Sequence, residues 1–369
     1  MTEERDERAT LPPERVRQIA QARVAVVVNG NARRVSEELV QVLDQLVQSG
    51  DLFVSRSLDE GRDIARRIVE QGYHTVLTGG GDGTFVQTVT WIVHESKKQG
   101  HEPPRFGLLR LGTGNALAWV LGAQNSRRRG VFADLSRLRR EGGSRPLRLL
   151  EVEGTLSPFA GLGGDAIALQ HFHNVKSLFE RTPVLKKVGT GSLAYAAAIF
   201  GRVLPEYVTK PKLRVRVINL GAPALVIGPD GRPAERTIPA GATIFEGATK
   251  LVAASSIPYW GFGARVFPFA DEKEGMFSLR LVDYSPFEFV REFRGIFNGT
   301  YRSESVIDVL AERVRVESDD PIPFQIGGDP HGERTSVEIA ISDTPIRVVD
   351  YYAPPEVVER LGVDPGRST

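Results

Sequence analysis

One run of eight residues constrains the fold of this chain more than any other. Leu77 and Thr78 end an apolar stretch, and Gly79-Gly80-Gly81-Asp82-Gly83-Thr84 follows directly. An amphipathic segment, residues 85–93, comes next. Residue types in this order predict a buried strand, a tight turn and the start of a helix. The turn is suited to binding phosphate, because glycines expose the backbone and a helix N-terminus presents N–H donors.

Asp82 is the one acid in this turn. A carboxylate repels a phosphate, so Asp82 is not expected to bind the anion itself. We expect it to act on a metal ion, a water molecule or a proton. The sequence therefore predicts a phosphate site with a carboxylate built into it.

The strand–turn–helix pattern recurs along the first part of the chain. Apolar, strand-like runs cover residues 23–28, 51–55, 74–77 and 105–111, and helical patterns cover 36–46 and 58–71. This alternation predicts a doubly wound α/β domain. After Gly143 it gives way to short strand-like runs at 147–152, 213–217, 248–254, 277–282, 313–316 and 337–341, with helical segments near 192–203 and 286–297. That texture predicts an antiparallel β-sandwich.

Composition excludes several classes of function. The 369 residues exceed one ordinary core, so two domains are expected. The net charge of +1 gives no electrostatic sign of a nucleic-acid partner, and the absence of cysteine excludes disulfides, iron–sulfur clusters and thiolate zinc sites. No apolar run approaches the ~18 residues of a membrane span. The charged N-terminus argues against a secretory signal, so we expect a cytoplasmic protein.

Two more glycine-containing turns follow predicted strands. Asn29-Gly30-Asn31 comes after the first strand, and Gly112-Thr113-Gly114-Asn115 comes after the fourth. Ligands of doubly wound sheets bind at these strand ends. Thr113 could donate to a phosphate, while Asn115 could hold the loop or a nucleotide group, or act as a helix N-cap. Neither the P-loop pattern nor the dinucleotide pattern follows the first strand, which disfavours those two classes.

In order and position, the three turns resemble those of the diacylglycerol kinase-like catalytic domain, a family that includes bacterial lipid kinases, sphingosine kinases and ceramide kinases. The likeness continues at residues 160–166, 261–276 and 324–329, and so covers about 23–352. The resemblance implies an N-terminal α/β domain, a C-terminal β-sandwich domain and a nucleotide cleft between them. We expect a disordered head at 1–20, the first domain at 21–145, the sandwich at 146–345, and a segment at 346–369 that could return to the first domain.

The resemblance implies ATP-dependent phosphorylation of a lipid hydroxyl, with Mg²⁺ as the second cofactor. Asp329 would be the general base, and Asp82, together with Asp165, could act on Mg²⁺ through water. The expected partner is a lipid at a membrane surface, to which the protein would bind peripherally, and a homodimer is an open expectation. The expected nucleotide contacts are Asn29, Gly30, Asn31, Ala32, Arg33, Ser57, Gly80, Gly81, Asp82, Gly83, Thr84, Gly112, Thr113, Gly114 and Asn115.

The chain departs from the family pattern at several positions, one of which is Ala116, where many relatives carry an acid. Gly30 stands where the family usually has proline after asparagine. The late motif, commonly Asp-Gly-Glu, reads Gly327-Gly328-Asp329, so the first acid is missing and the base is one methylene shorter. Glu333 is a reserve candidate for the base, or an exposed loop acid.

Asp271 and Glu274 lie in a segment that aligns with a loop binding a structural Mg²⁺ in some bacterial members. Their carboxylates could supply oxygen ligands there, although a solvated acidic turn explains them equally well. The basic run at 126–129 could be a solvated face or contact anionic headgroups.

Two other functions stay open. An NAD kinase-like enzyme would share the Gly-Gly-Asp-Gly-Thr turn, although the Gly-Thr-Gly-Asn turn argues against it. A non-catalytic nucleotide or lipid sensor would explain the altered late motif. The identity of the acceptor lipid does not follow from the sequence.

Overall fold

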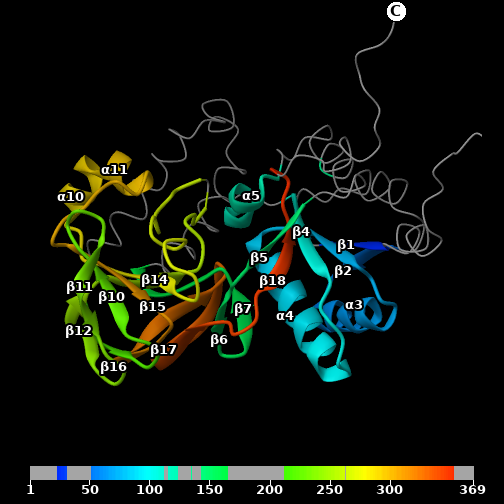
Figure 1. The fold of residues 1–369 in the computed structure, drawn as a ribbon, viewed down its shortest axis with the longest axis horizontal. Coiled ribbons are helices and arrows are strands. Elements are labelled where there is room, and N and C mark those ends of the chain that lie inside the picture. Colours follow the sequence, from blue (N-terminus) through cyan, green and yellow to red (C-terminus); the bar gives the residue numbers. More distant parts are fainter. Residues whose placement is uncertain are drawn as a thin grey trace, which may run out of the picture.

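The computed structural model describes residues 23–30, 51–111, 115–123, 134, 143–164, 212–261 and 263–352. The described chain forms two sheets that lie side by side (Figure 1). One has six strands in the order β2-β1-β3-β4-β18-β5, and the other has twelve strands. An α/β domain is thus followed by a β-sandwich domain, which confirms the predicted fold class.

Four parallel strands form the body of the first sheet: β1 (Val24–Asn29), β2 (Leu52–Ser55), β3 (Thr75–Gly80) and β4 (Arg105–Arg110). β1, β3 and β4 are runs that are mostly buried, as parallel strands covered on both faces require, whereas only Phe53 of the edge strand β2 is buried. β1 pairs with β2 on one side and with β3 on the other. This reversal of strand order between β1 and β3 is a topological switch point, where such sheets bind ligands.

Helices α3 (Leu58–Glu70), α4 (Asp82–Gln99) and α5 (Ala116–Leu121) follow β2, β3 and β4. α3 buries Ile64, Ala65 and Ile68 along one face. It packs closely on α4 because Gly61 has no side chain, and a Cβ there would overlap the ring of Trp91. The helix predicted at 36–46 lies outside the described residues.

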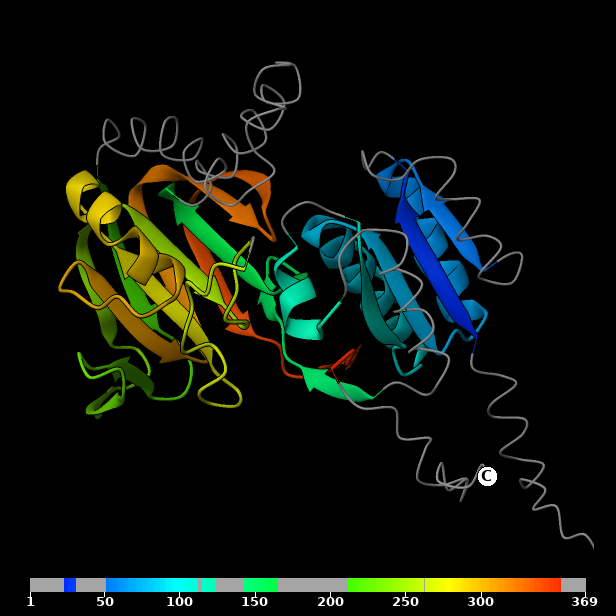
Figure 2. The same cartoon turned by 90° about the horizontal axis from the view of Figure 1, so that it is seen from above.

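Two strands from outside the α/β alternation complete the first sheet. β18 (Ile346–Val349) lies parallel to β4, and β5 (Ser144–Leu147) pairs antiparallel with β18. The chain therefore returns from the second sheet to the first near its C-terminal end, as Figure 2 also shows.

The second sheet is antiparallel and has its own core, which includes Leu162, Val252 and Phe324. Two short helices, α10 (Pro286–Arg291) and α11 (Phe293–Phe297), interrupt it where the sequence predicts helix. Its strands are β6 (Leu150–Val152), β7 (Thr155–Ser157), β8 (Phe159–Gly163), β9 (Leu213–Asn219), β10 (Ala224–Ile227), β11 (Pro233–Ile238), β12 (Thr243–Thr249), β13 (Leu251–Ser255), β14 (Phe277–Val282), β15 (Val306–Ala311), β16 (Arg313–Ile326) and β17 (Asp329–Ile341).

The single strand predicted at 248–254 is wrong, because this run contains the end of β12 and most of β13. β12 pairs with β9, whereas β13 pairs with β8 and β14. The chain changes neighbours at Thr249, whose hydroxyl oxygen lies within hydrogen-bonding distance of the carbonyl oxygens of Leu251 (3.2 Å) and Val282 (3.0 Å). The helix predicted near 192–203 lies outside the described residues.

The two domains meet along α4. Thr90 in α4 accepts a hydrogen bond from the Leu156 N–H of β7 (3.0 Å), and its hydroxyl lies 3.4 Å from the Leu156 carbonyl oxygen. Gly327 lies against the same helix, because a Cβ there would be 2.7 Å from Cγ2 of Val86. No helix in the described part of the chain is long and apolar enough to cross a membrane.

Candidate functional site

The ends of β1 and β3 and the start of α5 meet at one edge of the first sheet. Asn29, the last residue of β1, places Nδ2 3.4 Å from Oγ1 of Thr84 at the start of α4. Asn115, just before α5, donates from Nδ2 to the carbonyl oxygen of Gly80 (3.0 Å). The three motifs singled out in the sequence thus contribute residues to one place.

The N-terminus of α4 forms the centre of this place. Gly81 is its N-cap residue in extended backbone conformation, with φ −93° and ψ −176°, and makes no side-chain cap. The first N–H groups of a helix have no partner within the helix and can donate hydrogen bonds to a bound anion. Gly80 must lack a side chain here, because a Cβ would overlap Oγ1 of Thr84. The glycines therefore let the turn fold tightly and leave the helix N-terminus open to a ligand.

Asp82 lies in the first turn of α4 and also caps α5. Its Oδ2 accepts from the Ala116 N–H (2.8 Å), and its Oδ1 accepts from the Leu117 N–H (3.3 Å). These are the first two amides of α5, so Asp82 takes the capping role that Asn115 could have had. Burial raises the pKa of Asp82 to about 6, against the two backbone hydrogen bonds that lower it, and the nearby Asp329 raises it further.

Asp329 reaches this site from the second domain. It is the first residue of β17 and pairs with Ile326, the last residue of β16. Between them Gly327 and Gly328 have φ values of 61° and 90°, as the first and second positions of a two-residue hairpin turn require. A Cβ on Gly83 would overlap the Asp329 carboxylate, so this carboxylate lies directly against the first turn of α4.

Gln325 holds this turn and is a residue that sequence reasoning missed as part of the site. Its side chain is almost fully buried, and its Oε1 accepts from the Gly328 N–H (2.8 Å). The Gly327 N–H donates to the Phe159 carbonyl oxygen (2.9 Å). A polar residue between the buried Phe324 and Ile326, just before two glycines, is the signal that could have identified it.

Asn115 is 1% exposed, and its Oδ1 has no hydrogen-bond partner among the described residues. This oxygen lies 3.9 Å from where a Cβ of Gly81 would be. Buried polar atoms are normally paired, so this oxygen, beside a phosphate-type turn, is available to accept a hydrogen bond from a ligand or to contact a cation.

Gly30 and Ser57 have clear structural roles. The Gly30 N–H donates to the Ser55 carbonyl oxygen (2.8 Å), a bond that proline could not make. A Cβ at Gly30 would also lie 2.9 Å from Cγ1 of Val54. The departure from the family's proline thus has a local physical reason. Ser57 is the N-cap of α3 and accepts from the Glu60 N–H (3.2 Å).

Some expected site residues cannot be placed. The expected nucleotide contacts Asn31, Ala32, Arg33, Gly112, Thr113 and Gly114, and the expected metal contact Asp165, lie outside the described residues. Asp271 and Glu274 are exposed in the turn before β14. Backbone hydrogen bonds close this turn: the Glu272 N–H donates to the Phe269 carbonyl oxygen, and the Met276 N–H donates to the Lys273 carbonyl oxygen. Within the described ranges, no group of three His, Asp or Glu side chains is arranged to hold a metal ion, so a Mg²⁺ site in this turn stays a prediction.

Comparison with protein families matches both domains. The model "Diacylglycerol kinase catalytic domain" matches residues 23–151, and the model "YegS C-terminal NAD kinase beta sandwich-like domain" matches residues 224–349. A curated relative, "Probable lipid kinase YegS-like" from Enterobacter sp. (strain 638), is 33% identical over 104 residues. That stretch covers 27% of this chain and only 33% of the relative's length.

Solved structures match over most of the chain. A putative diacylglycerol kinase from Bacillus anthracis str. Sterne has a TM-score of 0.58 at 14% identity, and the match covers 89% of this chain and 97% of that one. A second structure with that description and organism has a TM-score of 0.59, also at 14% identity and the same coverage. At these identities the likeness shows a shared fold.

Proposed function

Because this chain belongs to the diacylglycerol kinase-like family, we propose that it transfers the γ-phosphoryl group of ATP to the hydroxyl of a lipid. One observation carries the proposal: the Asp329 carboxylate of the sandwich domain lies against Gly83, in the first turn of the helix that would hold the phosphates. An acid and a phosphate site, each from a different domain, meet where an acceptor hydroxyl would have to be activated.

ATP and Mg²⁺ fit the residues that are present. The open N-terminus of α4 suits the phosphates, and the open Oδ1 of Asn115 suits a donor or a cation. Mg²⁺ prefers oxygen ligands and retains several waters, so Asp82 and Asn115 would hold it through water beside the phosphates. Bound there, the ion would neutralise charge on the phosphates.

The proposed chemistry is an in-line displacement. Asp329 accepts the proton of the lipid hydroxyl, and the hydroxyl oxygen forms a bond to the γ-phosphorus. The bond from the γ-phosphorus to the β–γ bridging oxygen breaks, and ADP leaves. Phosphoryl transfer depends mainly on positioning and charge stabilisation, which the α4 amides supply. Asp82, bonded to two amides of α5, fixes the position of α5 relative to α4.

The test is transfer of label from γ-labelled ATP, in the presence of Mg²⁺, to either a total lipid extract or NAD. We expect labelled product in the organic phase with the lipid extract. Label on NAD instead would favour the NAD kinase-like alternative, and ATP binding without any transfer would favour a sensor.

Replacing Asp329 tests its role as the general base. Asp329→Asn is expected to lower lipid phosphorylation by about 10²-fold or more, because a general base contributes about 10²–10⁴-fold. Glu333→Gln is the matched control, since Glu333 is exposed on the same strand four residues further on. If only the Glu333 variant lost activity, the assignment of the base would be wrong.

A further inference from the structure

Helix α10 presents an apolar surface to solvent. Phe287 is 73% exposed and Val290 is 49% exposed, and no residue of α10 is buried. These two residues lie three apart, so they share one helical face. Arg291, the last residue of α10, is exposed as well, and so is Arg294 in the following helix, α11. We refer to Phe287, Val290, Arg291 and Arg294 as the α10 face.

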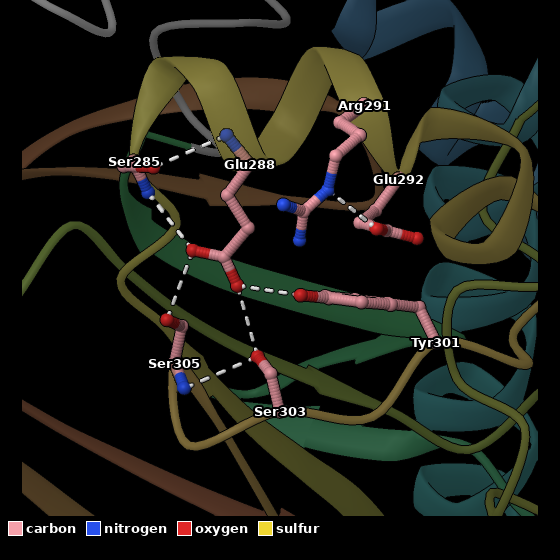
Figure 3. Close-up of polar contacts among 7 residues, drawn as sticks. All are labelled: Ser285, Glu288, Arg291, Glu292, Tyr301, Ser303 and Ser305. Carbon is pink, nitrogen blue, oxygen red and sulfur yellow. Dashed lines mark hydrogen bonds and ion pairs between the residues drawn. The ribbon is translucent and has the colours of Figure 1, made fainter.

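The helix behind this face is held firmly by a single carboxylate. Ser285 and Glu288 form a reciprocal capping box at the start of α10 (Figure 3). The Glu288 carboxylate also accepts from the hydroxyls of Tyr301 (2.9 Å), Ser303 (2.9 Å) and Ser305 (3.0 Å). These bonds fix the rotation of α10 about its axis. The exposure of Phe287 and Val290 therefore belongs to an ordered helix rather than to a loosely packed one.

Charge on this segment is distributed unevenly. Of its two acids, Glu288 is engaged with the three hydroxyls, and Glu292 is half-buried and accepts from Nε of Arg291 (2.7 Å). The Arg291 guanidinium lies 5.6 Å from the centre of the Phe287 ring, and the side chain remains 59% exposed. Arg291 thus places an exposed guanidinium group beside Phe287, and Arg294 of α11 is exposed as well. Apolar side chains flanked by arginines are typical of helices that lie in the interface of anionic membranes.

The size of the surface argues against a second copy of the chain as its occupant. A stable dimer needs roughly 800 Å² from each partner, with an apolar core. Two apolar side chains on a six-residue helix do not provide such a core. The same two side chains suffice for shallow insertion, which needs only a few apolar groups together with nearby positive charge.

We propose that the α10 face docks the protein onto an anionic lipid membrane. The choice of a membrane as the occupant rests on the proposed lipid-kinase function. α10 and α11 lie along the same side of the molecule as α5, whose first turn is tied to Asp82 (Figures 1 and 2). A membrane on this side would therefore face the domain boundary where the lipid acceptor must enter.

Vesicle binding tests the proposal without using the kinase reaction, so its outcome does not depend on whether phosphoryl transfer occurs. The wild-type chain is sedimented, in the absence of nucleotide, with vesicles of phosphatidylcholine alone or with about one third phosphatidylglycerol. We expect binding to the anionic vesicles and weaker binding at high salt. Phe287→Ser with Val290→Ser is expected to lower the partition coefficient at least tenfold, and Arg294→Gln roughly fivefold.

Leu58→Ser is the matched control, because Leu58 is an apolar residue that is 54% exposed on α3. It is expected to bind as the wild type does. Equal binding of the Phe287/Val290 double variant and the wild type, or no binding of the wild type to either vesicle, would overturn the proposal. A concentration-dependent dimer that the double variant abolishes would also overturn it, in favour of a contact between copies.

A labelling experiment covers the case in which the double variant misfolds. The chain has no cysteine, so Phe287→Cys introduces a single site for an environment-sensitive fluorophore. On anionic vesicles its emission is expected to shift to the blue and to gain intensity, whereas the same label on Leu58→Cys stays unchanged. An unshifted emission at position 287 under conditions where the protein sediments with vesicles would contradict docking through this face.

Discussion

Gly83 lets the two domains approach each other closely, because no side chain at this position separates α4 from the Asp329 carboxylate. Gly83→Ala would keep the helix, since alanine is the better helix former by about 1 kcal/mol. The added methyl must displace Asp329, however. We expect the melting temperature to hold or rise while kcat of lipid phosphorylation falls at least tenfold. Full activity in this variant would mean that catalysis does not need Asp329 in this position.

Asp82 links the stability of the protein to pH. Burial raises its pKa to about 6 from the ordinary 3.8. A group whose pKa is higher in the folded state contributes stability that is present below about pH 4 and is lost as pH rises through about 6. About two pKa units correspond to about 3 kcal/mol.

Asp82→Asn removes this titration. Between pH 4 and pH 7, urea unfolding should therefore shift in favour of the asparagine variant, relative to the wild type, by up to about 3 kcal/mol. Glu333→Gln is the control, because Glu333 is exposed. Parallel pH profiles of wild type and Asp82→Asn would contradict the raised pKa.

Where β1 and β2 end, a backbone hydrogen bond between these neighbouring elements explains why glycine stands at position 30. The Gly30 N–H donates to the carbonyl oxygen of Ser55 at the end of β2. Restoring the family's residue with Gly30→Pro removes this donor, whereas Gly30→Ala keeps it and adds a Cβ near Val54. The proline variant should be less stable than the alanine variant by about 1–3 kcal/mol in urea unfolding. Equal midpoints would show that the bond does not matter.

Elements with a strong local pattern were predictable from the sequence. Strands β1, β2, β3 and β4 are apolar runs bounded by turn residues, and each lies within a few residues of its predicted position. β14 matches the predicted range 277–282. The prediction of one strand at 248–254 failed because two strands with different partners are separated here by a single residue, Lys250. No turn residue such as glycine or proline marks the point where one strand ends and the next begins.

The site was predictable as a set of motifs but not as a set of contacts. The sequence places Asn29, Gly80 and Asn115 near strand ends, and parallel strands bring those ends together. That Asp82 caps α5 and that Asp329 lies against Gly83 depend on how separate elements pack. Such contacts arise from residues far apart in the chain, and no local pattern encodes them.

At the scale of the whole molecule, β18 makes the first domain depend on the end of the chain. It lies between β4 and β5, and Ile346, Val348 and Val349 are buried in the first core. A fragment of residues 23–151 would lack β18 and leave β4 as an unprotected edge.

We expect that fragment to aggregate or to unfold without a cooperative transition, whereas a chain ending at residue 352 should melt cooperatively. Calorimetry and sedimentation distinguish the two results. A soluble 23–151 fragment with a sharp transition would show that the first domain folds alone.

In the proposed reaction, the N-terminus of α4 holds the phosphates of a nucleotide, with Asp82 and Asp329 beside them. A crystal structure of the protein with ADP and Mg²⁺ tests this most directly. We expect phosphate oxygens within hydrogen-bonding distance of the backbone N–H groups of residues 82–84. A nucleotide bound at another place, with this helix N-terminus empty, would contradict it.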